Sequence, residues 1–310
     1  MVKNSISICI PTYKRANYLR QALSSIIEAD LRPIEVVIGD NGGGDQDTAI
    51  IVAAYESRLP IKYIVHKPPL NYGGNLKAIL SIAQGDWVSV IHDDDFYLSG
   101  CGNKLRCALQ ESDFDFFFSD HLICSNDGLL LSVESKENSK KYNRYLLKRG
   151  YVQDSLEAVL LSQVCMDGWF ARRELVQSVR VDSRWPEYID TQYLVQFALN
   201  SKRWFYENES TFSYRLTSAN LTASGIKVQE LFDYYSNLRL EKEKHIEIRD
   251  RTLTKYAPVA VTRWLQAGEK DKARECLQSK YYSAPKTIRG FIKYVIQMVW
   301  MYFSKTKKNN

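Results

Sequence analysis

The chain has 310 residues, a formal net charge of +6, and hydrophobic and charged fractions of 45% and 25%. A chain of this length and composition is typical of a globular protein with one sizeable α/β domain and an extension. Its six scattered cysteines form no Cys-x-x-Cys pair, so neither a zinc site nor a disulfide framework is expected, and a cytoplasmic location fits. An apolar strand begins almost at once, and a signal peptide is therefore not expected.

Strands and helices alternate through the first hundred residues. The predicted strands span residues 5–10, 34–39, 61–65 and 87–91, and the predicted helices between them span residues 17–29, 47–58 and 71–83. This alternation predicts right-handed crossovers and a mostly parallel sheet. In such sheets ligands bind beyond the carboxyl ends of the strands. The loops that follow the strands are therefore expected to meet at one crevice.

Three adjacent carboxylates, Asp93, Asp94 and Asp95, follow the fourth of these strands. They repel one another and are costly to remove from water at the end of a buried strand. A hard divalent cation such as Mg²⁺ or Mn²⁺, which prefers clustered oxygens, relieves that cost. The alternative is a solvated acidic turn, because Asp is common at turns.

The first two loops supply candidates for a nucleotide pocket. Pro11 fixes the chain after the first strand so that Thr12 and Tyr13 line the pocket. Tyr13 either stacks on a base or covers the end of the sheet. Asp40, at the end of the second strand, is expected to accept a hydrogen bond from the edge of a base.

A turn before the third helix is a candidate for binding anionic oxygens. Asn71, Gly74 and Asn75 belong to a flexible Asn-Tyr-Gly-Gly-Asn segment that leads into the amino end of that helix. Arg15 is a further candidate for binding such anionic oxygens, although a solvated arginine is the common alternative.

Four sequence blocks, at residues 7–15, 36–42, 71–75 and 85–95, occur in an order and spacing that resembles family 2 glycosyltransferases with the GT-A fold, of the type that builds bacterial cell-surface polysaccharides. The resemblance covers roughly residues 5–100. It implies a nucleotide-diphospho-sugar donor, a divalent metal, Mn²⁺ or Mg²⁺, and transfer with inversion at the anomeric carbon. The expected acceptor is a hydroxyl of a glycan or of a lipid-linked saccharide.

The expected chemistry gives each carboxylate of the triplet a role. A metal that bridges the diphosphate acts as a Lewis acid for the leaving group. Asp94 and Asp95 are the expected metal ligands, Asp93 and Asp94 the donor-binding residues, and the register within the triplet stays open. His92 departs from relatives that carry an acid nearby, and a packed or hydrogen-bonded histidine is its alternative role.

An inverting transfer needs one general base, which removes the proton of the acceptor hydroxyl. The candidates are Asp190, near the start of an apolar helix, and Glu187, three residues earlier. Asp190 has an alternative role as a helix cap. Trp169 and Trp185 are either platforms for a sugar or core residues.

Two further segments carry expectations about surfaces near the site. Residues 132–149 are polar and charged and are expected to form a surface loop, either over the acceptor or as a plain insertion. Arg215 and Asn220 are candidates to close over the diphosphate.

The last segment combines apolar, aromatic and basic residues. The uncharged run from 294 to 303 is too short to cross a bilayer, which takes about 20 residues. An amphipathic helix here predicts peripheral contact with the cytoplasmic face of a membrane, and a packed terminal helix is the alternative. No motif supports binding of nucleic acid.

These patterns predict a GT-A catalytic domain over residues 1–222, with a donor half at 1–100 and an acceptor half at 101–222, and a helical extension over 223–310. The predicted function is metal-dependent, inverting glycosyl transfer. One alternative, a nucleotidyltransferase, would carry a Gly-rich loop with Arg or Lys after the first strand, where Pro-Thr-Tyr stands instead. The other, a non-catalytic nucleotide-sugar-binding relative, should have lost its carboxylates.

Overall fold

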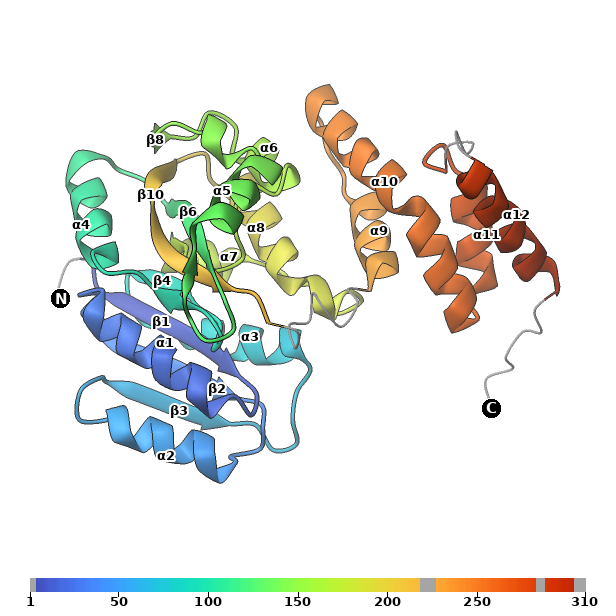
Figure 1. Cartoon of the computed structure of the whole chain (residues 1–310). Helices are drawn as coiled ribbons and strands as arrows, with labels where there is room; N and C mark the ends of the chain where they lie inside the picture. Colours follow the sequence, from blue (N-terminus) through green and yellow to red (C-terminus); the bar gives the residue numbers. More distant parts are fainter. Residues whose placement is uncertain (1–3, 218–226, 283–287, 304–310) are drawn as a thin grey trace. The chain divides into compact units, whose positions relative to one another are not determined.

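A computed structural model describes residues 4–217, 227–282 and 288–303 of the chain. The chain divides into two compact units, residues 1–220 and 221–310, which Figure 1 shows in the colours of the sequence. The domain boundary that the sequence predicts, between residues 222 and 223, lies outside the described residues.

The first unit contains ten strands and eight α-helices among its described residues. The strands are β1 (Ile6–Thr12), β2 (Glu35–Asp40), β3 (Ile61–Val65), β4 (Trp87–Val90), β5 (Phe96–Tyr97), β6 (Phe116–Cys124), β7 (Leu130–Leu131), β8 (Gly150–Tyr151), β9 (Phe170–Arg172) and β10 (Trp204–Arg215). The helices are α1 (Ala16–Glu28), α2 (Gln46–Tyr55), α3 (Tyr72–Ser81), α4 (Cys101–Glu111), α5 (Ser132–Lys141), α6 (Ser155–Leu160), α7 (Arg173–Ser178) and α8 (Ile189–Asn200), with 3-10 turns η1 (Arg144–Leu146) and η2 (Pro186–Tyr188).

All ten strands belong to one sheet, in the order β3-β2-β1-β4-β9-β6-β10-β5, with β7 beside β6 and β8 beside β10. The half formed by β3, β2, β1 and β4 is parallel, as the alternation of strands and helices predicts. β9 runs antiparallel to both of its neighbours, β4 and β6. The chain therefore has the mixed α/β architecture, with a mostly parallel central sheet, that the sequence predicts.

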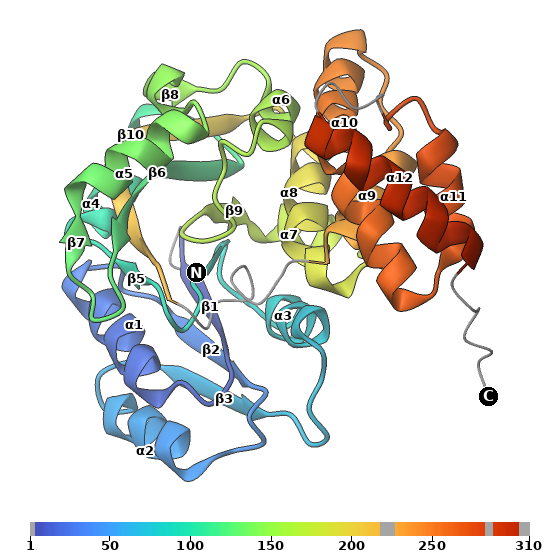
Figure 2. The same ribbon diagram turned by 45° about the vertical axis from the view of Figure 1, so that its right-hand side comes forward.

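Helices cover both faces of the parallel half. α1 and α2 lie on one face and α3 on the other, as Figures 1 and 2 show together. Every residue of β1, β2 and β4 is buried, because a strand covered on both faces needs apolar side chains in both directions. α1 buries Leu19, Leu23 and Ile26, which recur at helical spacing.

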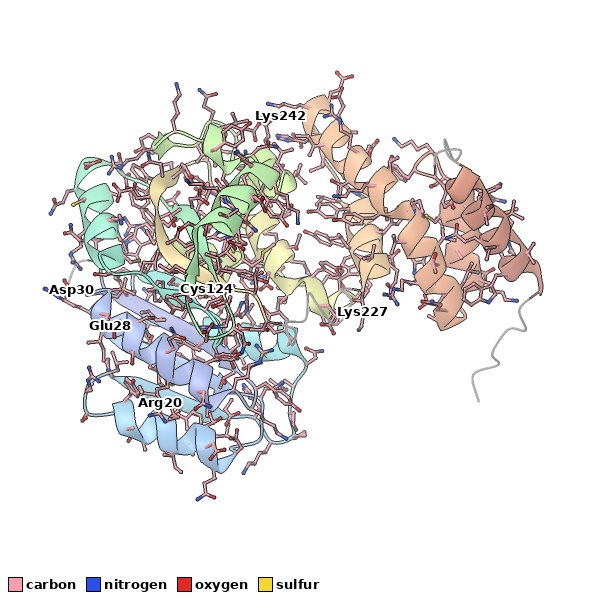
Figure 3. The ribbon with its side chains drawn as sticks, viewed as in Figure 1. Arg20, Glu28, Asp30, Cys124, Lys227 and Lys242 are labelled. Carbon is pink, nitrogen blue, oxygen red and sulfur yellow. The ribbon has the colours of Figure 1, made fainter. Side chains whose placement is uncertain are left out.

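The register of the strands decides what lies at their carboxyl ends. Thr12 of β1 is paired with Asp40 of β2, so these two loops begin side by side. β10 runs antiparallel to β5, with Ser213 opposite Phe96, and this brings Arg215 towards the residues that precede β5. Arg215 is also paired with Cys124, which Figure 3 labels in the first unit.

Aromatic residues build the core of the second half of this sheet. The ring of Phe116 on β6 stacks on that of Trp204 on β10, with 4.0 Å between centroids. The ring of Phe117 stacks on that of Phe205 at 6.1 Å, and the ring of Phe114 lies at a tilt to it, at 5.2 Å. These parallel neighbours are far apart in the sequence, and the stacked rings hold them in register.

The structure differs from the sequence prediction in three local features. Residues 132–149 are not a plain loop, because they contain helix α5 and the turn η1. The apolar and aromatic residues of segment 164–170 also predict a strand, which in the structure begins only at Phe170. α1 begins at Ala16, with Arg15 at its cap position, one residue before the start predicted at residue 17.

The second unit is helical in its described residues. Its helices are α9 (Val228–Asn237), α10 (Glu243–Ala267), α11 (Lys270–Gln278) and α12 (Ile288–Phe303). α10 ends in a left-handed Gly268, a common helix stop, and α11 follows directly. Phe232 of α9 packs edge-on against Trp264 of α10. No helix of the described residues is long and apolar enough to cross a bilayer.

Candidate active site

The three carboxylates of the Asp triplet lie beyond β4 and have different partners. Asp93 accepts hydrogen bonds from the hydroxyl of Thr12 at 2.7 Å and from the backbone N–H of Tyr13 at 3.3 Å. Arg15 contacts the other oxygen of Asp93 at 3.4 Å and donates to Asp94 at 2.6 Å. The loop after β1 and the triplet therefore form one cluster, as the shared end of the sheet predicts.

Asp95 points away from this pair into the protein. One of its oxygens accepts the backbone N–H of Arg215 at 2.8 Å. Its second oxygen, Oδ2, is buried and has no hydrogen-bond partner among the residues that the structure describes. A buried carboxylate oxygen without a donor is costly, and a cation is one way to offset that cost.

Arg215 is a structural brace of this cluster. It is 1% exposed, and its Nε donates to the backbone carbonyl of Asp94 at 2.6 Å. Its other nitrogens donate to the carbonyl of Asn126 at 2.9 Å and to the side chain of Gln21. In this structure its guanidinium thus holds backbone carbonyl groups in place. Asn220, the other residue that is predicted to close over the diphosphate, lies outside the described residues.

His92 is held from both sides. Its backbone N–H and its Nδ1 contact the two oxygens of Asp167, at 2.9 and 2.6 Å. The backbone N–H of Gly168 donates to the carbonyl of Val90 at 2.9 Å, extending the antiparallel contact of β9 with β4. This register explains why a residue just before β9 lies beside one just after β4.

The Nε2 of His92 lies 2.6 Å from the hydroxyl of Tyr72 at the start of α3. That hydroxyl donates in turn to the carboxylate of Asp190, at 2.9 and 2.8 Å from its two oxygens. Since the single proton of Tyr72 serves Asp190, the Nε2 of His92 must donate to Tyr72. Asp167, His92, Tyr72 and Asp190 thus form one continuous chain of hydrogen bonds.

Gly73 allows the close approach of helices that the hydrogen bond from Tyr72 to Asp190 needs. A side-chain Cβ at Gly73 would lie 2.7 Å from the backbone carbonyl of Pro186, in the turn η2 before α8. A larger residue would push α3 away from η2 and α8. The amino ends of α3 and α8 therefore approach closely, and Tyr72 and Asp190 meet there.

The charges of the cluster shift the pKa values of its members. Burial raises the pKa of Asp190 to about 6, against the lowering influence of His92 and of the Tyr72 hydroxyl. Burial and the neighbouring charge of Asp94 raise the pKa of Asp93 to about 6 as well. Burial opposes charge on His92, but the carboxylates around it, Asp167 first, hold its pKa well above the usual value. His92 is therefore a cation that donates from both ring nitrogens.

A group of potential metal ligands lies beside the triplet. His92, Asp95 and Asp167 each bring one potential ligand atom to within 4.8 Å of the others. His92 is already committed to Asp167 and Tyr72, whereas the Oδ2 of Asp95 has no described partner. Burial and the neighbouring carboxylates raise the pKa of Asp95 well above its usual range, which shows how unfavourable this charge is without a cation. The carboxylates of this cluster fit a divalent metal.

The loop after β2 is built around Asp40. Its oxygens accept the backbone N–H groups of Gly42 at 2.7 Å and Gly44 at 3.1 Å and the hydroxyl of Tyr63 at 2.5 Å. Asp40 is fully buried. Its contacts fix the shape of the loop, and its contact with a nucleotide base stays a prediction.

The turn before α3 is also tied to the sheet. Asn71 caps the helix by accepting from the backbone N–H of Gly74 at 2.7 Å. The amide of Asn75 donates to the carbonyl of Gly39 at 2.9 Å, and its oxygen lies 3.0 Å from the ring of His66. These contacts hold α3 against the ends of β2 and β3.

Tyr13 is a predicted pocket residue that is open to solvent. Its side chain is 56% exposed beside the Asp93 cluster, and this exposure suits a platform for a planar ring. Pro11 and Thr12 are buried at the end of β1. Trp169 and Trp185, by contrast, are 3% and 6% exposed, so the structure places both in the core.

The structure brings Thr12, Arg15 and the Asp triplet together and links Asp190 to the triplet through Tyr72 and His92. Tyr72 and Asp167 are site members that the sequence analysis did not identify. Glu187 lies in the 3-10 turn before α8, and Asp190, three residues later, accepts a hydrogen bond from Tyr72. Asp167 stands in a Met-Asp-Gly-Trp segment before a short strand. The glycine that follows it, Gly168, has a φ of +70° in the structure, and in the sequence this glycine indicates only a turn.

A hollow of about 700 Å³ lies at the opposite end of the sheet. Asp115 before β6 and Arg203 before β10 belong to its lining. Arg203 pairs with Asp113 and Asp115. Its position at the amino ends of these strands separates it from the carboxylates described above.

Comparison with known proteins identifies the family. The model of Glycosyl transferase family 2 matches residues 7–179, more than half of the chain. The chain belongs to glycosyl transferase family 2. It is therefore a glycosyltransferase, as the four sequence blocks predict, and not a nucleotidyltransferase.

Curated relatives of this family 2 enzyme include named glycosyltransferases. It is 22% identical over 248 residues to the GalNAc(5)-diNAcBac-PP-undecaprenol beta-1,3-glucosyltransferase of Campylobacter jejuni, covering 79% of this chain and 75% of that protein. It is 28% identical over 173 residues to the uncharacterized glycosyltransferase YwdF of Bacillus subtilis, covering 55% of this chain and 59% of that one. It thus spans less than two thirds of the Bacillus relative.

Solved structures show the same fold. The crystal structure of S. aureus TarS 1-349 superposes with a TM-score of 0.62 at 14% identity, covering 96% of this chain and 91% of that one. The mannosyltransferase PcManGT of Pyrobaculum calidifontis, in complex with GDP-Man and Mn²⁺, superposes with a TM-score of 0.56 at 14% identity, covering 95% and 87%. The GT-A fold of this family 2 glycosyltransferase is therefore confirmed.

Proposed function

We propose that this enzyme transfers a sugar from a nucleotide-diphospho-sugar to a hydroxyl of a glycan or a lipid-linked saccharide, with inversion at the anomeric carbon. The observation that carries the proposal is the link from Asp190 to the Asp triplet through Tyr72 and His92. Asp190, with a pKa of about 6, is thereby linked to the charged groups at the carboxyl ends of the strands. A carboxylate of that pKa is ionised at neutral pH and basic enough to take a proton.

Asp190 is the proposed general base. Its partial exposure leaves it open to a substrate, while Tyr72 fixes its orientation by donating to both oxygens. As the acceptor oxygen forms its bond to the anomeric carbon, its proton passes to Asp190. Glu187, in the 3-10 turn three residues earlier, is the rival base.

The donor side is proposed to comprise the loop after β1, the loop after β2, the start of α3 and the triplet. Tyr13 stacks on the base, Asp40 accepts from its edge, and Arg15 meets the diphosphate when it leaves Asp93 and Asp94. Pro11, Thr12, Asn71, Gly74 and Asn75 shape the walls of the pocket. TarS has been solved with UDP-GlcNAc and PcManGT with GDP-Man, which supports a donor of this class.

A divalent cation, Mn²⁺ or Mg²⁺, is proposed at Asp95, with Asp94 as a second ligand and Asp167 within reach. When bound, it would neutralise the negative charge that develops on the leaving diphosphate. The Oδ2 of Asp95 without a described partner supports this choice, and so does the Mn²⁺ in the PcManGT complex.

The acceptor and the location of the enzyme extend the proposal. The Campylobacter relative is named for an undecaprenol-linked acceptor, which supports a lipid-linked saccharide here. Residues 1–222 would form the catalytic domain, with donor and acceptor halves that meet near residue 100. The helical extension over 223–310 would hold the enzyme at the cytoplasmic face of a membrane as a peripheral protein.

The test is a transfer assay with UDP-, GDP-, dTDP- and CDP-sugars, with and without Mn²⁺, read by release of the nucleoside diphosphate and by the anomeric configuration of the product. One donor should give a product of inverted configuration. Retention of configuration, or no release from any donor with any saccharide acceptor, would contradict the proposal.

A further inference from the structure

The last helix of the chain, α12, has two faces with opposite surroundings. Its inner face contains Gln297, which is 2% exposed, and Met301, which is 4% exposed. Tyr294 on the same side has its ring 5.8 Å from that of Tyr282. Positions 294, 297, 298 and 301 follow the spacing of one helical stripe.

Hydrogen bonds fix the rotation of α12 about its own axis. The side-chain amide of Gln297 donates to the carbonyl of Pro258 and to the hydroxyl of Thr262 in α10, both at 2.7 Å. The hydroxyl of Tyr282 donates to the oxygen of the same amide. A buried amide with three partners is costly to displace, so the inner face stays on α10.

The opposite stripe is apolar and open to solvent. The outer face of α12 consists of Ile292, Val295, Ile296 and Val299, at exposures of 52%, 40%, 56% and 50%. These positions are again i, i+3, i+4 and i+7 on the helix. A contiguous row of β-branched apolar residues in solvent marks a site of interaction.

The charge of the surrounding sequence selects the kind of partner. No Asp or Glu occurs after Glu275, whereas six basic residues follow position 285. They are Lys286, Arg289, Lys293, Lys305, Lys307 and Lys308. Basic residues that flank an apolar helical stripe suit an anionic lipid surface, which attracts each of them.

We propose that the outer face of α12 docks on an anionic lipid bilayer, with the helix lying in the interface. At 16 residues the helix is about 24 Å long, shorter than a span of about 20 residues requires. The proposal deepens the peripheral contact suggested above and gives it a surface. It does not depend on the transfer chemistry.

The test is co-sedimentation of the full-length protein with vesicles of phosphatidylglycerol and phosphatidylcholine. The double variant Ile296→Asn/Val299→Asn should lower the partition constant about tenfold or more, because it removes apolar area from the interface. The matched control Ile50→Asn/Val133→Asn changes side chains that are 56% and 65% exposed in the first unit, and it should bind like the wild type. High salt should weaken the wild type only in part, because the apolar contribution remains.

A second variant is expected to change lipid binding in the opposite direction. Val295→Leu/Val299→Leu adds one methylene at each position and should tighten binding several-fold, since each buried methylene contributes about 0.8 kcal/mol. Equal binding of the Asn variant and the wild type would overturn the proposal. An unchanged partition constant in the Leu variant would also overturn it. So would a lower melting temperature of both variants, because it would show that this face is packed inside the protein.

Discussion

The hydroxyl of Tyr72 lies 2.9 and 2.8 Å from the two oxygens of Asp190, although 118 residues separate them in the chain. Tyr72 starts α3 and Asp190 lies in the first turn of α8. The same hydroxyl accepts from His92, which stands directly before the Asp triplet. One phenol therefore connects the proposed base to the proposed donor site.

Removal of this hydroxyl tests whether it positions the base. Tyr72→Phe keeps the ring against His92, 5.7 Å between centroids, and removes the hydroxyl together with its bond from His92 and its bond to Asp190. The bond lowers the pKa of Asp190, so its loss should raise that pKa and reduce kcat at pH 7 on the order of tenfold. The KM for the donor should change little, and the acid limb of the kcat profile should move to higher pH.

Tyr55→Phe is a matched control, because the Tyr55 hydroxyl bonds to Ser24 at 2.5 Å on the face of the sheet that α1 and α2 cover. It should leave the kcat profile unchanged. An equal loss of kcat in both variants would show a general effect of the missing hydroxyl on packing.

The raised pKa of Asp190 predicts the pH dependence of the reaction. Its folded-state pKa of about 6 lies above the unfolded value of about 3.9, so protonation is easier in the folded protein. The base is ionised above pH 6, and kcat should rise through an apparent pKa near 6 and then level off. The same shift contributes stability below about pH 4 that is lost between about pH 4 and 6. A kcat that is flat from pH 5 to 8 would exclude Asp190 as the base.

The metal site makes a prediction that does not need a known substrate. Wild-type protein should melt at a higher temperature with Mn²⁺, because an ion that binds only the native state stabilises it, by about 2.7 kcal/mol at 100 times Kd. Asp95→Asn keeps the acceptor for the Arg215 backbone N–H and removes the charge. It should abolish the Mn²⁺-dependent shift.

The same variant should melt no lower than the wild type in EDTA. The pKa of Asp95 is raised, so its ionised form destabilises the metal-free fold at neutral pH, and an uncharged amide relieves that cost. A strong loss of melting temperature in EDTA would mean that Asp95 serves the fold and not an ion.

Gly168 sets the path of the chain between Asp167 and β9. It has a φ of +70°, and a Cβ there would lie 2.2 Å from the ring of Phe212, which is 1% exposed. Gly168→Ala should lower the free energy of unfolding by roughly 2 kcal/mol or more, through backbone strain and overpacking.

Gly100→Ala has the same backbone strain, at a φ of +82°, and open space around the new methyl group. It should cost only about 1 kcal/mol. Equal losses in urea unfolding for Gly168→Ala and Gly100→Ala would show that the contact with Phe212 is not important.

The fold was predictable because its signals are local. The buried strands β1, β2 and β4 and the helices between them follow from apolar periodicity, and the parallel order places Thr12 and Asp40 side by side. The positions of Arg15 and the Asp triplet at one edge follow from the same rule.

The remainder of the site depends on pairing between distant strands. Asp167 reaches His92 only because β9 inserts antiparallel between β4 and β6, and a three-residue strand carries no periodic signal. Tyr72 reaches Asp190 because Gly73 allows α3 to approach η2 and α8. Helix α5 was missed because its sequence is polar on every side and lacks an apolar stripe.

The central claim is that Asp190 takes the proton of the acceptor, and steady-state transfer kinetics of two matched variants test it most directly. Asp190→Asn should lower kcat by about 10²-fold or more, as expected for the loss of a general base, with donor affinity nearly unchanged. Glu187→Gln, an equally conservative change three residues earlier, should retain most of the wild-type kcat. A large loss of kcat in Glu187→Gln, with Asp190→Asn close to the wild type, would contradict the account.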